Sequence, residues 1–144
     1  MPMSDNGLHI EAPAAAEEPA APRRPIYLDL TRIRQPIPAI VSILHRVSGA
    51  ALFLVGIPLL LYALQQSLAS PTSYATLQAM LARPAVKIVL LVLVWSYLHH
   101  FCAGIRYLLL DLHVGTDLKP ARQSGVAVLI ASLALTAIIG ARLW

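Results

Sequence analysis

The residues of this chain best suited to chemistry are polar side chains set in long apolar segments, and they form two groups. The first group lies in the run SILHRVSG, where Ser42, His45, Arg46 and Gly49 are spaced by three, four and seven residues and share one helix face. Ionisable groups inside an apolar helix are costly, so they usually mark a functional site. The alternative is an arginine that extends its head group to a membrane interface beside hydrated His and Ser neighbours. The spacing leaves both interpretations open.

The second group lies in the run HHFCAGIRY and extends to an aspartate. Steps of four, three and four place four residues on one stripe: His100, Gly104, Tyr107 and Asp111. His99 and Arg106, seven residues apart, line a neighbouring stripe. A histidine near the middle of a membrane helix can be an axial ligand of haem iron, and a glycine one turn away lets a macrocycle or another helix come close. The alternative is a histidine hydrogen-bonded to a backbone carbonyl of a neighbouring helix. The chain has no CxxCH motif, which excludes a covalent c-type haem.

The composition indicates that a membrane surrounds both groups. The chain has 144 residues, of which 58% are hydrophobic and 12% charged, with a mean hydropathy of +0.69. Soluble domains carry about 25% charged residues. The net charge of +4 is therefore attributed to membrane topology, and no nucleic-acid partner is expected. A single cysteine, Cys102, excludes an intrachain disulfide and a multi-cysteine zinc or iron–sulfur site built from this chain alone.

The spacing of charges predicts an all-α membrane protein with three antiparallel transmembrane helices. Uncharged runs cover 47–82, 88–105 and 123–141, and a bilayer core needs about 20 apolar residues in a helix. Polar residues from Gln65 to Ser73 divide the first run. The predicted helices cover about 39–65, 85–111 and 124–143. A short surface helix is expected over 72–82, because Ser70-Pro71 resembles a cap followed by proline in the first turn.

The ends of the chain and its orientation follow from composition and charge. Residues 1–23 are rich in Ala, Pro and Glu and are predicted to be a disordered tail before a membrane-anchor domain at 24–144. Eight basic residues are expected on one side of the membrane and three on the other, which places the N-terminus in the cytoplasm or its organellar equivalent. The eight are Arg23, Arg24, Arg32, Arg34, Arg46, Arg106, Lys119 and Arg122, and the three are Arg83, Lys87 and Arg142.

The combination of SxxHRxSG before one span and HxxxGIR in the next resembles a known family. Together with Arg24-Pro25, Pro36-Ile37-Pro38-Ala39 and Asp111, these motifs are similar to the cytochrome b556 subunits of succinate dehydrogenase, the larger membrane anchor of respiratory complex II. The resemblance covers about residues 24–143. It implies three transmembrane helices with the N-terminus in the cytoplasm or matrix, in agreement with the charge pattern. The expected location is a bacterial inner membrane rather than a mitochondrial one.

The resemblance also implies roles for individual residues. His100 would be an axial ligand of a b-type haem, with the second ligand supplied by a smaller anchor subunit. His45, Arg46 and Arg106 would lie near the haem propionates, and Ser42 and Arg46 would border a ubiquinone site. The implied partners are a flavoprotein, an iron–sulfur protein, the second small anchor, ubiquinone and the lipid bilayer. This chain alone would catalyse nothing, but it would help pass electrons from succinate oxidation to ubiquinone.

The sequence departs from the family pattern at three places. Many members have histidine where this chain has Tyr107, many read Asp-x-Gly where this chain runs from Asp111 to Gly115, and His99 adds a second candidate ligand. Two alternatives therefore stay beside the main interpretation. One is a haem-free structural or assembly protein of three helices, and the other is a fumarate reductase anchor.

Overall fold

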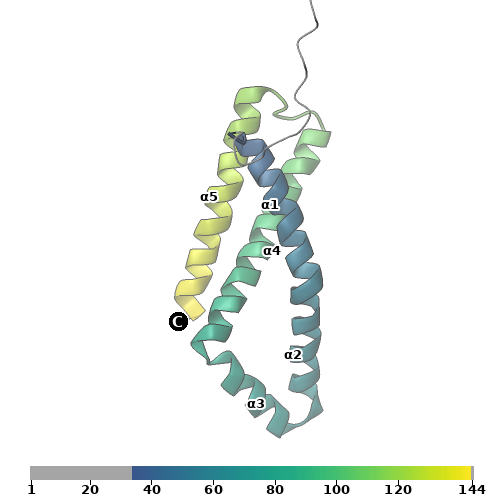
Figure 1. Ribbon diagram of the computed structural model, residues 1–144, viewed down its shortest axis with the longest axis vertical. Helices are drawn as coiled ribbons and strands as arrows, with labels where there is room; N and C mark the ends of the chain where they lie inside the picture. Colours follow the sequence, from purple (N-terminus) through teal and green to yellow (C-terminus); the bar gives the residue numbers. More distant parts are fainter. Residues whose placement is uncertain (1–33, 144) are drawn as a thin grey trace, which may run out of the picture.

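The structure is a computed structural model, and it describes residues 34–143. These residues are helical and contain no strand, as predicted. Three segments are long and apolar enough to cross a membrane: Ile37–Ala69, Pro84–Asp111 and Leu118–Leu143. In Figure 1 the chain descends through the first segment, returns through the second and descends again through the third. The predicted tail, residues 1–23, lies outside the described residues.

The helix bounds follow proline and cap positions more closely than the limits of the apolar runs. The elements are α1 (Ile37–Ala51), η1 (Leu52–Gly56), α2 (Ile57–Ala69), α3 (Pro71–Leu81), α4 (Pro84–Asp111) and α5 (Leu118–Leu143). Proline occupies one of the first two positions of α1, α3 and α4, where its missing N–H leaves no bond unmade. The third helix begins at Leu118 rather than at 124, because its first turns are polar and extend beyond the apolar run.

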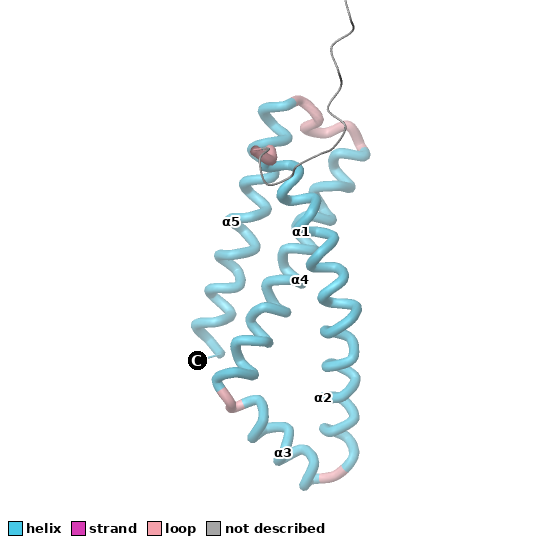
Figure 2. The backbone as a smooth tube through the Cα atoms, viewed as in Figure 1, coloured by secondary structure: helices cyan, strands magenta, loops and turns pink. Residues whose placement is uncertain are grey.

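The short helix predicted over 72–82 is present as α3. Its N-cap is Ser70, whose side chain accepts a hydrogen bond from the backbone N–H of Ser73, while the Ser73 side chain accepts one from the N–H of Ser70. This capping box satisfies donors that the start of a helix leaves free. The turn between α4 and α5 contains His113 and Gly115 with φ of 60° and 74°. Figure 2 shows the corner between α2 and α3, the break between α3 and α4, and the turn between α4 and α5 as brief interruptions of the helices.

The first span is two α-helices joined by a π-helical turn. Within η1 the N–H of Ile57 bonds to the carbonyl of Leu52, five residues earlier. Pro58 follows at once, and proline cannot donate to the helical ladder. A π-turn at this point changes the rotational register of the two halves. The upper half, α1, packs against α4 and α5, whereas α2 contacts α3 and diverges from α4 (Figure 1).

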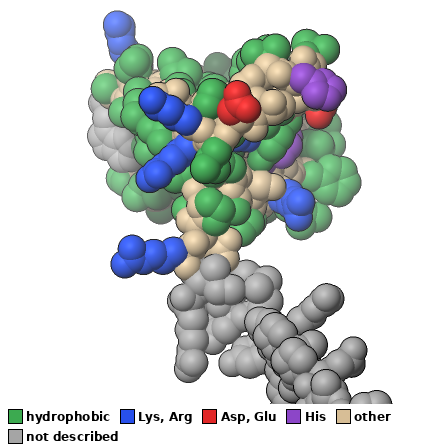
Figure 3. Space-filling view, turned by 90° about the horizontal axis from the view of Figure 1, so that it is seen from above, with side chains coloured by type: hydrophobic (Ala, Val, Ile, Leu, Met, Phe, Trp, Pro, Cys, Tyr) green, Lys and Arg blue, Asp and Glu red, His purple; other side chains and the backbone are tan. Residues whose placement is uncertain are grey.

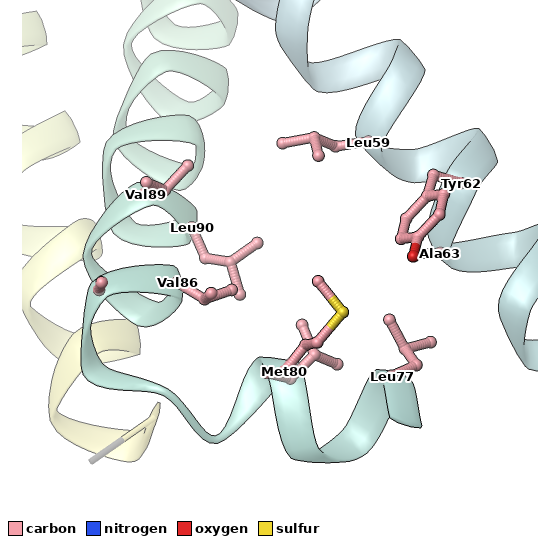
Figure 4. Close-up of a pocket in the computed structure, with 10 residues that line it drawn as sticks. Leu59, Tyr62, Ala63, Leu77, Met80, Val86, Val89 and Leu90 are labelled. Atoms are coloured by element: carbon pink, nitrogen blue, oxygen red, sulfur yellow. The ribbon is translucent and has the colours of Figure 1, made fainter. Parts of the chain in front are cut away.

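The divergence leaves an apolar cavity of about 310 Å³ in the lower part of the protein, between α2, α3 and the start of α4. Figure 4 shows side chains from all three helices turned toward it, including Leu59, Met80 and Val89. The tightest core lies elsewhere, where Val41 of α1, Ala103 of α4 and Val128 of α5 meet. The polar residues singled out in the sequence surround this upper core, so the fold separates an apolar lower half from an upper half that carries the candidate chemistry.

Candidate functional site

The candidate site lies where α1 and α4 pack against each other, and two histidines form its centre. The rings of His45 and His100 are stacked, with their centroids 4.1 Å apart and an angle of 8° between their planes. The two motifs predicted separately from the sequence therefore meet in space. His45 follows the α1 face that continues from Val41, and His100 lies one turn before Gly104 on α4.

One nitrogen of His100 is held by α1. Its Nδ1 lies 2.9 Å from the backbone carbonyl oxygen of His45 and 3.3 Å from the hydroxyl oxygen of Ser48. A carbonyl oxygen can only accept, so this hydrogen bond requires Nδ1 to carry the proton. In the neutral form of this tautomer Nε2 has a lone pair, and it makes no hydrogen bond within residues 34–143. A neutral imidazole with Nδ1–H bonded to a carbonyl and Nε2 open is the form that binds a metal.

The backbone of α1 also leaves room for the His100 ring. A Cβ atom added at Gly49 would lie 2.7 Å from Cε1 of His100 and 3.1 Å from its Nδ1, closer than a methyl group can approach. At Gly104, the glycine that the sequence suggested for close approach, the nearest atom would be Nε2 of His45 at 3.9 Å, an ordinary contact. The tight approach is therefore at Gly49. In the sequence, the glycine that ends the first motif, SILHRVSG, is the feature that could have indicated this close approach.

The adjacent histidines 99 and 100 have different surroundings. His99 is 0% exposed, and both of its ring nitrogens are buried without a hydrogen-bond partner among the described residues. Its ring stacks on Trp95, with centroids 5.3 Å apart. His100 is only half-buried. A histidine that ligates a haem held between this chain and another subunit must lie at the surface of this chain. The exposure of the two side chains therefore favours His100 over His99 as the haem ligand.

Arg106 points to a different helix from the histidine pair. It is 5% exposed, and its Nε donates to the hydroxyl oxygen of Ser124 at 3.0 Å while its Nη2 donates to the carbonyl of Ala121 at 3.1 Å. Both acceptors belong to the first turns of α5. The neighbouring Tyr107 instead approaches His45 edge-on, with centroids 5.2 Å apart, and its buried hydroxyl has no partner within residues 34–143.

Ser42 and Arg46 lie on α1, nearer its start than the histidine contact. Ser42 is half-buried and Arg46 is exposed. Since Ser42, Arg46 and Gly49 follow steps of four and three, they form one flank of α1, and His100 rests against its Gly49 end. The rise of an α-helix puts Ser42 about 10 Å along the axis from Gly49. Figure 3 views this end of the molecule, where Lys and Arg side chains project around the rim.

The arrangement provides an exposed guanidinium and a hydroxyl on one flank of α1, and an imidazole nitrogen of His100 on α4 that is free of hydrogen bonds within residues 34–143. Within residues 34–143, no group of three or more His, Cys, Asp or Glu side chains is placed to hold a metal ion. An axial haem ligand requires only one side chain from each of two elements, with the porphyrin supplying the remaining nitrogens. The donor set thus fits a haem ligated through Nε2 of His100.

Comparison with known proteins gives consistent matches over most of the chain. The family described as succinate dehydrogenase/fumarate reductase transmembrane subunit matches residues 20–139. The succinate dehydrogenase cytochrome b556 subunit of Coxiella burnetii is 36% identical over 123 residues, which cover 85% of this chain and 98% of that protein. The subunits of the same name from Rickettsia prowazekii and Paracoccus denitrificans are 33% and 31% identical, over 81% and 78% of this chain and 90% and 85% of theirs.

Proposed function

The chain belongs to the succinate dehydrogenase/fumarate reductase transmembrane subunit family, and on this premise we propose that it holds a b-type haem and part of a ubiquinone site. As a membrane anchor it would bind a flavoprotein and an iron–sulfur subunit, which oxidise succinate, and a second small anchor that shares the haem. The name of its relatives, cytochrome b556 subunit, supports a b-type haem. The bilayer would be a bacterial inner membrane with the N-terminus in the cytoplasm.

The observation that carries the proposal is the open Nε2 of His100. Its ring is oriented by the bond between Nδ1 and the His45 carbonyl, at the edge of this chain where a ligand from another subunit could approach from the opposite side. When bound, the haem would supply reversible one-electron chemistry. The protein's part would be to hold the ligating His100, exclude water and neutralise the propionates, for which His45 and Arg46 are the candidates on α1.

Of the two arginines expected near the propionates, we propose that Arg46 is better placed than Arg106 to bind one. Two of its donors are engaged on Ser124 and Ala121, so only its remaining N–H groups could reach a carboxylate. Arg46 is exposed on the flank of α1 that leads to Gly49 and His100. A charged donor on this flank is suited to a carboxylate or to a quinone oxygen.

The proposed quinone site uses Ser42 and Arg46. A quinone head group presents two carbonyl oxygens and needs donors, and these residues, four apart, offer a hydroxyl and a guanidinium on one flank. Preorganised donors at the oxygens where negative charge develops lower the barrier to reduction. The site would lie near the cytoplasmic surface, where electrons from the iron–sulfur subunit arrive.

Purification of the tagged full chain from its native membranes tests this function. We expect a flavoprotein, an iron–sulfur protein and a second small membrane protein to co-purify, and a reduced-minus-oxidised spectrum to show a b-type haem. A complex with these partners but no haem would contradict the haem assignment. Purification without a flavoprotein would favour the alternative of a structural or assembly protein.

A further inference from the structure

Ser48 and Gly49 are the two α1 residues that lie against the Nδ1 side of the His100 ring, and the proposed function assigns neither of them a role. Ser48 is 1% exposed, although it lies on a helix whose outer side chains are largely exposed. Both residues face α4, and both contact the ring of His100. We infer that they are positioning residues that fix the plane and the protonated nitrogen of the His100 imidazole; the inference rests on the proposed haem ligation.

The hydroxyl of Ser48 completes a closed set of hydrogen bonds around Nδ1. Its proton is donated to the carbonyl oxygen of His45 at 2.9 Å. Its lone pairs are then free to accept from Nδ1 of His100 at 3.3 Å, while the same Nδ1 lies 2.9 Å from that carbonyl. The Nδ1–H of His100 therefore faces two acceptors, the Ser48 hydroxyl oxygen and the His45 carbonyl oxygen, and the hydroxyl also donates a hydrogen bond to that carbonyl. This arrangement favours the tautomer in which Nε2 is unprotonated.

Gly49 and His45 fix the plane of the ring. The His45 ring covers one face of the imidazole at a centroid distance of 4.1 Å, nearly parallel to it. The Cε1–Nδ1 edge lies so close to the α-carbon of Gly49 that a Cβ there would come within 2.7 Å. An alanine would force the ring to turn or shift, and either movement would break the bonds of Nδ1. Partners of a ligating histidine that act in this way commonly change metal affinity by about 10–100-fold.

The test compares two variants with two matched controls, all in the assembled complex. Ser48→Ala removes the hydroxyl, and Gly49→Ala removes the space. Ser132→Ala is the control for the serine, because Ser132 is also fully buried and bonds to the carbonyl three residues earlier, that of Leu129. Gly56→Ala is the control for the glycine, because its added Cβ would meet no atom closer than 3.5 Å.

Two readouts separate positioning from general stability. Electron paramagnetic resonance of the oxidised haem reports the relative orientation of the axial imidazole planes, and transfer to apomyoglobin reports how fast the haem is lost. We expect shifted g values and about tenfold faster haem loss for Ser48→Ala and Gly49→Ala. Both controls should match the unmodified complex.

A Ser48→Ala complex with unmodified g values and the haem-loss rate of Ser132→Ala would overturn the inference. This variant decides the matter even if Gly49→Ala fails to assemble, since it removes only one oxygen atom. The proposed function fails separately, and recognisably, if the unmodified complex has no haem or if His100→Ala retains its spectrum.

Discussion

A double-mutant cycle on Arg106 and Ser124 tests how α5 is attached to the rest of the bundle. The Nε of Arg106 donates to the Ser124 hydroxyl at 3.0 Å, and this is a contact between α4 and α5 at a residue only 5% exposed. The cycle uses Arg106→Met, Ser124→Ala and the two changes together. The coupling energy isolates this one bond from the cost of burying the charge, which is common to both backgrounds.

The hydrogen bonds of Ser124 limit the coupling energy that the cycle should measure. If Arg106 is removed, the Ser124 hydroxyl still donates to the carbonyl of Ala121 at 3.1 Å, so no buried donor is left unpaired on α5. The loss is therefore the net value of an interhelical bond, which in membrane proteins averages about 0.6 kcal/mol and reaches about 1.7 kcal/mol. Because the donor is charged and buried, we expect a coupling in the upper half of that range.

Unfolding of the full chain in mixed micelles, followed by circular dichroism as the fraction of SDS rises, gives the free energy of unfolding for each variant. The control pairs Arg106→Met with Ser132→Ala, whose hydroxyl donates to the carbonyl of Leu129 in its own helix, and these changes should add within about 0.3–0.5 kcal/mol. If Arg106→Met and Ser124→Ala add to the same precision, the predicted coupling between the two side chains does not exist. An altered haem spectrum in Arg106→Met with no coupling to Ser124 would instead favour the propionate role.

Three further predictions concern the haem, the quinone and the topology. His100→Ala should abolish the b-type spectrum and His99→Ala should retain most of it; the reverse result would mean that the inward-facing histidine is the ligand. Arg46→Leu would remove the charged hydrogen bond that we propose to a quinone oxygen, worth about 1.5–3 kcal/mol, so succinate–quinone reductase activity should fall at least about tenfold while reduction of a soluble acceptor persists. Unchanged quinone reduction and inhibitor affinity would leave Arg46 as an interfacial arginine. Reporter fusions should place the α4–α5 turn in the cytoplasm and α3 and the C-terminus outside, and a cytoplasmic signal from α3 would contradict the proposed topology.

The three spans could be predicted because burial of charge in a bilayer is so unfavourable that uncharged runs mark them directly. The predicted helix starts were less accurate, since Lys119 and Arg122 belong to the first turns of α5 although they lie before the apolar run 123–141. A charged residue marks where a helix leaves the hydrocarbon core, but the helix can continue beyond that point into the polar region. The π-turn at Leu52–Gly56 was not predicted, because no spacing rule distinguishes a wide turn from a regular one.

Within the site, periodicity could place residues on a face but could not pair the faces. The contact between His45 and His100 depends on the axial offset between α1 and α4, which no repeat within a single helix specifies. For the same reason Arg106 could be placed beside His99 on a stripe, yet its attachment to Ser124 and Ala121 required the position of a third helix. The role of Ser48 depends on a carbonyl of the backbone, which side-chain patterns do not describe.

The corner between α2 and α3 has a consequence for how the protein responds to the thickness of its bilayer. The first span has 33 residues, which at about 1.5 Å each exceed a hydrocarbon core of about 30 Å, so it must tilt or project. Ser70 is the one residue between the end of α2 and the start of α3; its bonds with Ser73 fix the start of α3, and the two helices also contact each other. Because so short a connection joins them, a change in the tilt of α2 would be expected to move α3 and the α3 side chains that line the apolar cavity, among them Leu77 and Met80.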